Sequence, residues 1–315
     1  MKPIRVLQVV TIMNRGGLET MLMNYYRKLD RSKIQFDFMT NRSERGHYDD
    51  EIESLGGKLY RLSPIKPGNY NKYFNELDQF FKENKEYKVV HSHINENSGF
   101  VLKAAKKAGV PCRIAHSHLS DLKLDYKYPF RVYARRSLKG NVSDYFACSK
   151  RAGEWLFGKK ISNSGKIIVL NNAVDTQKFK INEDIRHKMR EKLGIEGKKV
   201  IGHVGRFNPQ KNHEFLIDIF NEVYKKNKNA VLLLVGDGYL KEKIEDKVKK
   251  LQLEDSVRFL GVREDIPELM QAMDLFLFPS QFEGLAVVMV EAQAAGLKVI
   301  TSTGAVSYTH LTLPT

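Results

Sequence analysis

Apolar runs alternate with segments of helical spacing along nearly the whole of this 315-residue chain. Short apolar runs predict buried strands, and apolar residues three and four positions apart predict helices that pack on those strands. Repeated strand-then-helix units are typical of parallel sheets covered by helices on both faces. In the first half, the predicted strands are Val6–Val10, Phe36–Met39, Val89–His91, Arg113–His116, Tyr145–Cys148 and Ile167–Leu170, and the predicted helices are Leu18–Leu29 and Gly99–Ala108.

The same alternation restarts near residue 200, after the polar stretch 171–199. A chain of this length has enough residues for two cores. The restart therefore predicts two α/β domains, with a ligand site in the cleft between them. In the second half, the predicted strands are Val200–Val204, Ala230–Val235, Val257–Leu260, Leu275–Phe278 and Lys298–Thr301, and the predicted helices are His213–Lys226, Tyr239–Leu251, Ile266–Ala272 and Ala286–Ala295.

The composition is that of a soluble globular protein, with 42% hydrophobic and 28% charged residues. Only Cys112 and Cys148 are present, which excludes a disulfide framework and favours a reducing compartment. The apolar N-terminal segment has no small-residue cleavage site behind it, and no run reaches the roughly 18 apolar residues that a spanning helix needs. These features predict a cytoplasmic protein.

The net charge of +15 lies almost entirely in the first half of the chain. Residues 1–165 contain 30 Lys and Arg against 17 Asp and Glu, a net +13, which predicts an anionic partner for this half. Nucleic acid is the generic candidate, but the sequence has no recognised reading helix or aromatic RNA platform, so we expect no nucleic acid. A negatively charged membrane surface is the other candidate.

The basic residues are densest in Lys123–Lys160, which has ten Lys and Arg against three acidic residues. Aromatic residues alternate with the basic ones, and Pro129 is well placed to begin a helix with a cationic face. Such a helix suits peripheral contact with an anionic membrane, at the inner face of the plasma membrane. The alternative is a solvated helix whose Phe130 and Tyr133 pack inward, and the sequence does not choose between them.

Two carboxylates eight positions apart, Glu283 and Glu291, mark the strongest candidate site. Glu283 lies in a glycine-containing turn after the strand Leu275–Phe278, and Glu291 lies in the helix that this turn opens. A strand, a turn and a helix N-terminus favour phosphate, because unpaired N–H groups and the helix dipole point out there. A carboxylate in that turn is suited to the hydroxyl groups of a sugar, so the pattern indicates a sugar nucleotide.

Two further motifs follow the first strand of each half. Arg206 and Lys211 stand five positions apart where both can reach a diphosphate, whose negative charge grows as a glycosidic bond breaks. Gly16-Gly17 lack the side chains that would block close approach of the backbone to a ligand. The two motifs agree with a phosphate-bearing ligand.

These motifs, with Val235–Gly238, Phe259–Gly261 and Asn171–Asp175, have the order and spacing found in family 4 of the GT-B glycosyltransferases. Over residues 1 to about 304 the chain resembles these retaining enzymes, and it looks most similar to bacterial exopolysaccharide and capsule glycosyltransferases. The resemblance implies two Rossmann-like domains facing across a cleft, an acceptor-binding domain over 1–170 and a nucleotide-sugar-binding domain over 171–304.

The resemblance also implies roles for individual residues. Glu283 would contact the donor sugar, Glu291 the ribose hydroxyls, and His116 the donor sugar in the transition state. The catalytic candidates are His116, Arg206, Lys211 and Glu283. The donor-binding candidates are Gly16, Gly17, Gly236, Val262, Gly284, Leu285 and Glu291, and the acceptor-side candidates are Glu19, His93 and His118.

Four histidines come in two pairs, His91 with His93 and His116 with His118, at the ends of two predicted strands. Imidazoles are common zinc ligands. We expect an i, i+2 pair leaving a strand to place its rings on opposite faces, so that neither pair chelates. No Asp-x-Asp motif is present in the sequence either. The prediction is therefore no metal and no cofactor.

Together these features predict a hexosyltransferase that moves a hexose or N-acetylhexosamine from a nucleotide-diphosphate sugar, with UDP as the expected nucleotide, to a lipid-linked saccharide in exopolysaccharide or capsule synthesis. In the family, transfer is thought to proceed on one face of the sugar, with the departing phosphate assisting deprotonation of the acceptor. Two alternatives remain open, a GT-B sugar-nucleotide epimerase or phosphorylase and a basic nucleic-acid-binding protein.

Residues 305–315 look unlike the family, whose members continue after this point with further strand–helix units. The tail resembles translated sequencing-adaptor read-through, so we expect it to be artefactual and the second domain to be incomplete. Exposed apolar surface and low stability are then expected.

Overall fold

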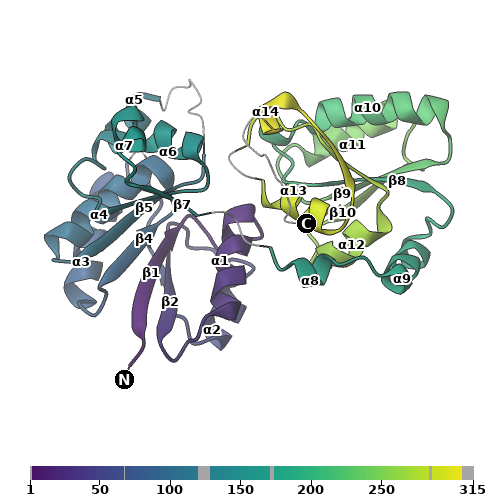
Figure 1. The fold of residues 1–315 in the computed structure, drawn as a ribbon. Helices are drawn as coiled ribbons and strands as arrows, with labels where there is room; N and C mark the ends of the chain where they lie inside the picture. The colour runs from purple at the N-terminus through teal and green to yellow at the C-terminus, as the bar shows by residue number, and fades with distance from the viewer. Residues whose placement is uncertain (1, 67, 120–127, 171–173, 284–285, 307–315) are drawn as a thin grey trace. The chain divides into compact units, whose positions relative to one another are not determined.

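A computed structural model describes residues 2–66, 68–119, 128–170, 174–283 and 286–306. The chain divides into two compact units, Met1–Ala173 and Val174–Thr315, which we call unit 1 and unit 2 and describe separately. In Figure 1, unit 1 runs from purple to teal and unit 2 from green to yellow. The sequence placed the division slightly earlier, after residue 170.

The described part of unit 1 is built on a seven-stranded sheet whose neighbouring strands are all parallel. The strands predicted in this half are all present, with small shifts at their ends. In sheet order the strands are β3 (Leu59–Arg61), β2 (Ile34–Thr40), β1 (Ile4–Val10), β4 (Val89–Ser92), β5 (Cys112–Ser117), β6 (Asp144–Ala147) and β7 (Ile167–Val169).

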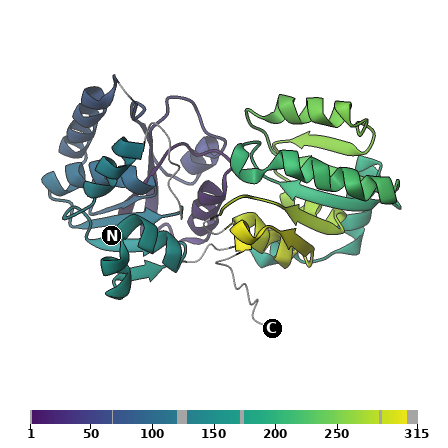
Figure 2. The same ribbon diagram turned by 90° about the horizontal axis from the view of Figure 1, so that it is seen from above.

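Helices cover both faces of this sheet (Figures 1 and 2). One face packs on α1 (Gly17–Lys28) and α2 (Asp49–Ser54), in a core that includes Tyr26 and Phe38. The other face carries the larger core of unit 1. Its helices are α3 (Tyr70–Glu83), α4 (Ser98–Lys107) with the short 3-10 helix η1 (Asn95–Asn97) before it, α5 (Tyr128–Arg136) and α6 (Lys150–Phe157), and α7 (Lys159–Asn163) follows α6.

The described part of unit 2 has a five-stranded sheet that is also parallel throughout. Its interior strand β9 is buried at every position, because helices cover it on both sides. In sheet order the strands are β10 (Val257–Gly261), β9 (Ala230–Val235), β8 (Lys199–Val204), β11 (Leu275–Phe278) and β12 (Lys298–Thr301).

The helices of unit 2 divide between the two faces of its sheet. On one face lie α10 (His213–Lys226) and α11 (Lys241–Lys250), and the short 3-10 helix η2 (Pro209–Lys211) precedes α10. The other face carries α8 (Thr176–Phe179), α9 (Glu183–Leu193), α12 (Ile266–Ala272), α13 (Val287–Ala294) and α14 (Thr303–Val306). The stretch 171–199, which the sequence described only as polar, therefore contains α8 and α9.

Both sheets have the strand order of a doubly wound α/β fold, which confirms the predicted fold class. The order reverses between β1 and β4 in unit 1 and between β8 and β11 in unit 2. Ligands in such sheets bind at the carboxyl ends of the two strands that flank the reversal. These two strand edges are therefore the places to look for a site.

Among the described residues, no helix combines the length and the apolar character that crossing a membrane requires.

Candidate active site

The loops after β8 and β11 meet at the strand-order reversal of unit 2. Lys211 comes from the loop after β8 and Glu283 from the loop after β11, and the Lys211 Nζ lies 2.7 Å from the Glu283 Oε1. Their side chains are only 16% and 9% exposed. The ammonium also lies 4.5 Å from the centre of the Phe278 ring, which adds a cation–π contact. A largely buried ion pair thus joins two segments that are 72 residues apart.

Backbone contacts hold the same two loops together. The Gln281 N–H donates to the Gln210 carbonyl at 2.8 Å, and the Gln210 amide donates to the Phe282 carbonyl at 3.0 Å. The loop after β8 is itself a capped turn, since the Asn208 side chain accepts a hydrogen bond from the Lys211 N–H at 3.1 Å. Asn212 then takes a left-handed conformation, φ 55°, which Asn tolerates better than most residues.

A glycine lets a third loop approach this edge. Gly236, directly after β9, has φ 131°, and a Cβ there would lie 2.2 Å from the Gly205 carbonyl oxygen. Its N–H donates to the Gly261 carbonyl at 2.8 Å. Arg206, next to Gly205, is exposed, and Val262 after β10 is also exposed. The carboxyl edge of unit 2 thus carries one exposed cation, Arg206, and one cation held in an ion pair, Lys211.

Glu291 lies in the second turn of α13 and is partly buried. Burial raises the pKa of its carboxyl from 4.5 to about 7. Its charge therefore depends on pH near neutrality, unlike that of an exposed glutamate. Gly284 and Leu285 were also predicted to bind the donor, and they lie outside the described residues.

At the strand-order reversal of unit 1, Gly16 is the N-cap of α1 and Gly17 is its first residue. Glu19 lies in the first turn of this helix, where a carboxylate interacts favourably with the helix dipole. The glycine pair therefore forms the strand-to-helix turn that the sequence predicted, at the edge where a ligand is expected.

The four histidines of the two predicted pairs form one buried cluster in unit 1. The expectation that the rings of each pair point apart was wrong. The ring centres of His91 and His93 lie 4.1 Å apart, and those of His116 and His118 are also 4.1 Å apart. Alternate residues of a strand point to the same face, so an i, i+2 pair can bring its rings together.

Hydrogen bonds link the cluster across β1, β4 and β5. His91 Nε2 lies 3.1 Å from His116 Nδ1, and His93 Nδ1 lies 2.9 Å from His118 Nε2. His93 Nε2 lies 2.8 Å from the Gln8 side-chain oxygen. Burial lowers the pKa of all four rings, that of His116 to about 3. The cluster is therefore neutral at pH 7.

Gln8 was missed by reasoning from the sequence, although a signal was present. It is a polar residue inside the apolar run of β1, and it is only 1% exposed. Buried polar side chains are normally hydrogen-bonded, so a glutamine at this position required a polar partner. Gln210 was missed as well, because nothing in its local sequence indicates that it reaches the loop after β11.

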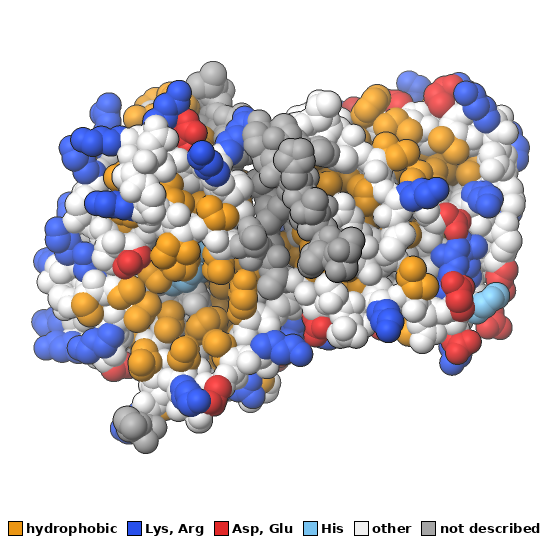
Figure 3. Space-filling model, in the orientation of Figure 1, with side chains coloured by type: hydrophobic (Ala, Val, Ile, Leu, Met, Phe, Trp, Pro, Cys, Tyr) orange, Lys and Arg blue, Asp and Glu red, His pale blue; other side chains and the backbone are white. Residues whose placement is uncertain are grey.

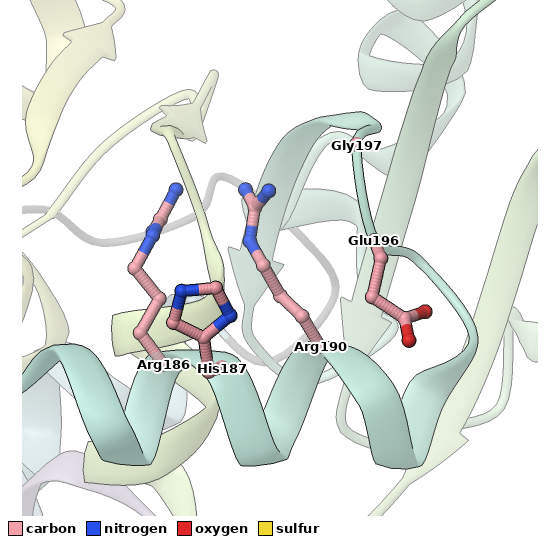
Figure 4. Close-up of a pocket in the computed structure, with 5 residues that line it drawn as sticks. All are labelled: Arg186, His187, Arg190, Glu196 and Gly197. Atoms are coloured by element: carbon pink, nitrogen blue, oxygen red, sulfur yellow. The ribbon is translucent and has the colours of Figure 1, made fainter.

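A pocket of about 120 Å³ lies elsewhere in unit 2 (Figure 4), lined by Arg186, His187, Arg190, Glu196 and Gly197. Its two arginines rise from the same side of α9 and both pair with Asp274, which precedes β11. Arg190 also donates to the Ala272 carbonyl at 3.0 Å. These contacts attach α9 to the amino edge of the sheet, away from the carboxyl edge that carries Glu283, so the arginines have a structural role.

The basic segment 123–160 is described from residue 128 onward. The helix predicted at Pro129 is present as α5. Phe130 stacks on Tyr70, with ring centres 5.0 Å apart, whereas Tyr133 is 62% exposed. Lys and Arg side chains lie at many points around the surface of unit 1 in Figure 3. Phe130 thus packs inward, as expected for a solvated helix. Tyr133 remains at the surface, as expected for a helix that contacts a membrane.

Comparisons with known proteins agree with this fold. Residues 15–178 match the family Glycosyltransferase Family 4, and residues 185–310 match Glycosyl transferases group 1. The putative glycosyltransferase EpsF of Bacillus subtilis is 40% identical over 302 residues, which are 95% of this chain and 79% of EpsF. The UDP-Gal:alpha-D-GlcNAc-diphosphoundecaprenol alpha-1,3-galactosyltransferase of Escherichia coli is 29% identical, over 85% of this chain and 72% of that enzyme.

Solved structures show the same fold. The crystal structure of Anabaena HepE in complex with UDP-glucose superposes with a TM-score of 0.79 at 22% identity, over 96% of this chain and 81% of that one. The parallel strand order of each unit agrees with this likeness. The chain therefore belongs to glycosyltransferase family 4 and is a glycosyltransferase with the GT-B fold of two Rossmann-like domains.

Proposed function

We propose that this enzyme transfers a hexose or N-acetylhexosamine from a UDP-sugar to a lipid-linked saccharide in exopolysaccharide or capsule synthesis, with retention of the anomeric configuration. The observation that carries the proposal is the Lys211–Glu283 ion pair at the strand-order reversal of unit 2. It brings a cation suited to phosphate and a carboxylate suited to sugar hydroxyls within 2.7 Å of each other.

The donor site in this proposal lies at the carboxyl edge of unit 2. Lys211 and the exposed Arg206 would bind the diphosphate, because its charge increases as the sugar departs. The N-terminus of α13 would supply backbone N–H groups, and Glu291 would accept hydrogen bonds from the ribose. The HepE complex with UDP-glucose and the UDP-Gal specificity in the name of the E. coli relative support UDP as the nucleotide.

The ion pair would exchange partners when the donor binds. Lys211 now neutralises Glu283, so neither buried charge is left alone. A diphosphate would offer Lys211 a stronger anionic partner, and Glu283 would then accept hydrogen bonds from hydroxyls of the sugar. The two residues would thereby couple recognition of the phosphate to recognition of the sugar.

We assign His116 the contact with the donor sugar that the family resemblance implies. Since burial lowers the pKa of this ring to about 3, His116 would act as a neutral hydrogen-bonding group and not as a proton donor. The departing phosphate would assist removal of the proton from the acceptor hydroxyl, and the reaction would require no metal ion.

The acceptor side of the proposal lies in unit 1. The turn at Gly16 and Gly17 leads into α1, and Glu19 in its first turn is suited to an acceptor hydroxyl. His93 and His118 are further candidates from the histidine cluster. A lipid-linked acceptor is supported by the diphosphoundecaprenol substrate in the name of the E. coli relative. The exposed Tyr133 and the basic residues of α5 would contact an anionic membrane at its cytoplasmic surface.

The proposal is tested by incubating the protein with each of four donors, UDP-glucose, UDP-galactose, UDP-GlcNAc and UDP-GalNAc, and a prenyl diphosphate-linked saccharide. We expect one donor to release UDP only when the acceptor is present, with EDTA making no difference. Mass spectrometry should show one added sugar residue, and NMR should show the anomeric configuration of the donor. An epimerised UDP-sugar without free UDP would instead indicate an epimerase, and sugar phosphate formed from inorganic phosphate would indicate a phosphorylase.

A further inference from the structure

Three histidines of unit 1 offer ring nitrogens to one small buried volume. His91 lies on β4, His116 on β5, and His93 directly after β4. One nitrogen from each ring lies within 4.8 Å of the other two, and all three side chains are buried. Strands β4 and β5 are neighbours in register, so the sheet itself holds these rings together.

The spacing of the rings suits a transition-metal ion. Zinc binds histidine nitrogen at about 2.0–2.1 Å, which places tetrahedral ligands about 3.3 Å apart. His91 Nε2 and His116 Nδ1 are already 3.1 Å apart. A nitrogen of His93 lies within 4.8 Å of nitrogens of both rings. The fourth ring, His118, is adjacent, with its Nε2 2.9 Å from His93 Nδ1.

Gln8 orients His93 in the way that outer partners orient metal-binding histidines. Its side-chain oxygen accepts from His93 Nε2 at 2.8 Å, which fixes the proton on that nitrogen and leaves the lone pair on Nδ1. Glutamine is an uncommon residue at a buried strand position, and here its side chain contacts the cluster.

A second observation comes from His116. Its Nε2 is buried and has no hydrogen-bond partner among the residues that the structure describes. Buried polar atoms are nearly always bonded, and an unbonded one calls for a ligand or a specific role. Because no described group holds Nε2, the ring can carry its proton there and present the lone pair of Nδ1, the nitrogen 3.1 Å from His91 Nε2, to an ion.

We propose that His91, His93 and His116 form a binding site for one divalent transition-metal ion of the zinc class. Neutral imidazoles suit zinc and neighbouring first-row ions and disfavour magnesium and calcium, which prefer oxygen. The ion takes no part in the transfer chemistry, which in the proposed function needs no metal.

One consequence rests on the proposed function. If His116 contacts the donor sugar, an ion that binds this ring will compete with that contact and inhibit transfer. In this scheme the ion inhibits transfer only by binding to the histidine site. Metal binding without inhibition would support the metal site but contradict the contact of His116 with the donor sugar. Binding and turnover must therefore be measured separately.

The test is calorimetric titration of ZnCl₂ into the metal-free 315-residue chain. We expect one equivalent to bind, and the visible spectrum of the Co²⁺-loaded protein should have the intensity of a tetrahedral site. His93→Ala and His116→Ala should each weaken Zn²⁺ binding by more than about 30-fold, and Gln8→Ala by about 10-fold. His187→Ala is the control, because His187 is an exposed histidine in unit 2. This control variant should bind Zn²⁺ with the affinity of the wild type.

A variant-free measurement covers the case in which these substitutions prevent folding. Histidine ring ¹⁵N shifts of the wild-type protein should move on Zn²⁺ addition for the four cluster residues only. Absence of Zn²⁺ binding by the wild type, equal affinity in all variants, or shifts confined to histidines outside the cluster would each overturn the proposal. The cluster would then be a hydrogen-bonded group of imidazoles that binds no ion.

Discussion

The Lys211 ammonium lies 2.7 Å from the Glu283 carboxylate, and this ion pair joins the loops that follow β8 and β11. Each charge is largely removed from water, so each depends on the other. The pair also lies at the edge where doubly wound sheets bind their ligands. A contact that stabilises the ligand-free enzyme is thus composed of the two groups that we propose for donor recognition.

Replacing Glu283 should separate transfer from nucleotide binding. In Glu283→Ala, we expect the transfer rate to fall by about 100-fold or more, because a hydrogen-bonding group to the reacting sugar is lost. The affinity for UDP should stay equal or increase slightly, since Lys211 no longer has a competing carboxylate. UDP affinity by calorimetry and turnover by UDP release are the two measurements. Glu222→Ala, in an exposed ion pair of α10, is the matched control and should alter neither. Lost UDP binding with intact transfer would contradict this role.

The ion pair should also be measurable in the stability of unit 2. Lys211→Met leaves Glu283 buried without its cation, and we expect a loss of about 3 kcal/mol in the free energy of unfolding. The double variant Lys211→Met/Glu283→Gln should recover most of this loss, because it removes the carboxylate charge together with the cation. Urea denaturation followed by far-ultraviolet circular dichroism measures the free energies of unfolding. The exposed Lys225–Glu222 pair should contribute less than about 1 kcal/mol in the same double-mutant cycle. Equal losses of unfolding free energy for the two pairs would contradict a larger contribution from the Lys211–Glu283 pair.

Glu291 should make donor binding depend on pH. Burial raises its pKa to about 7, and hydrogen bonds from ribose hydroxyls favour the charged form. The affinity for UDP-glucose should therefore fall by up to about tenfold per pH unit below 7, with a proton released on binding. Calorimetry in buffers of different ionisation enthalpy measures that proton. Glu291→Gln should remove the pH dependence, and its persistence in this variant would assign it to another group.

The same carboxyl has a linked effect on folding. The raised pKa means that the folded state holds this proton more tightly than the unfolded state, whose pKa is near 4.5. The contribution of Glu291 to stability is therefore lost as pH rises from 4.5 through 7. Glu291→Gln should unfold at higher urea than the wild type at pH 8, and at a similar concentration at pH 4.5. A lower midpoint at pH 8 would contradict the burial of this charge.

Helix α5 should contribute to membrane binding. Arg135→Glu/Arg136→Glu should reduce binding to vesicles with anionic phosphatidylglycerol, and Tyr133→Ser should reduce it further by removing an exposed aromatic ring. Vesicle sedimentation at low and high salt measures the effect, since salt weakens charge interactions. The matched control is Lys225→Glu/Lys226→Glu, at the end of α10 in unit 2. An equal loss in this control would show that net charge alone is responsible.

Much of the fold could be predicted, because most strands are short apolar runs whose character is local. β3 has three residues at the sheet edge, Leu59-Tyr60-Arg61, which form no continuous apolar run. Helix α3 was missed although its buried residues Tyr73, Leu77, Phe80 and Phe81 recur at helical spacing, since many polar residues lie between them. Local pattern thus sufficed for elements with continuous apolar character and failed where that character is interrupted.

The sequence named candidate residues for the site but could not predict their contacts. The motifs indicated Lys211 and Glu283 separately, whereas their ion pair depends on two loops that meet only after the sheet has formed. The histidine cluster was misjudged for a simpler reason, because i, i+2 side chains of a strand share a face. Burial of Glu291 and the contact of Gln8 with His93 also require the folded chain.

Calorimetric titration of UDP tests the central claim most directly, with the wild type, Arg206→Ala and Arg258→Ala compared. Arg206 is exposed, so its truncation should not disturb folding, and Arg258 is an exposed arginine on β10 of the same unit. We predict that the wild type binds UDP, that Arg206→Ala binds it about 10-fold or more weakly, and that Arg258→Ala binds it unchanged. A wild type that does not bind UDP, or equal affinities for all three proteins, would contradict a nucleotide-sugar site at the carboxyl edge of unit 2.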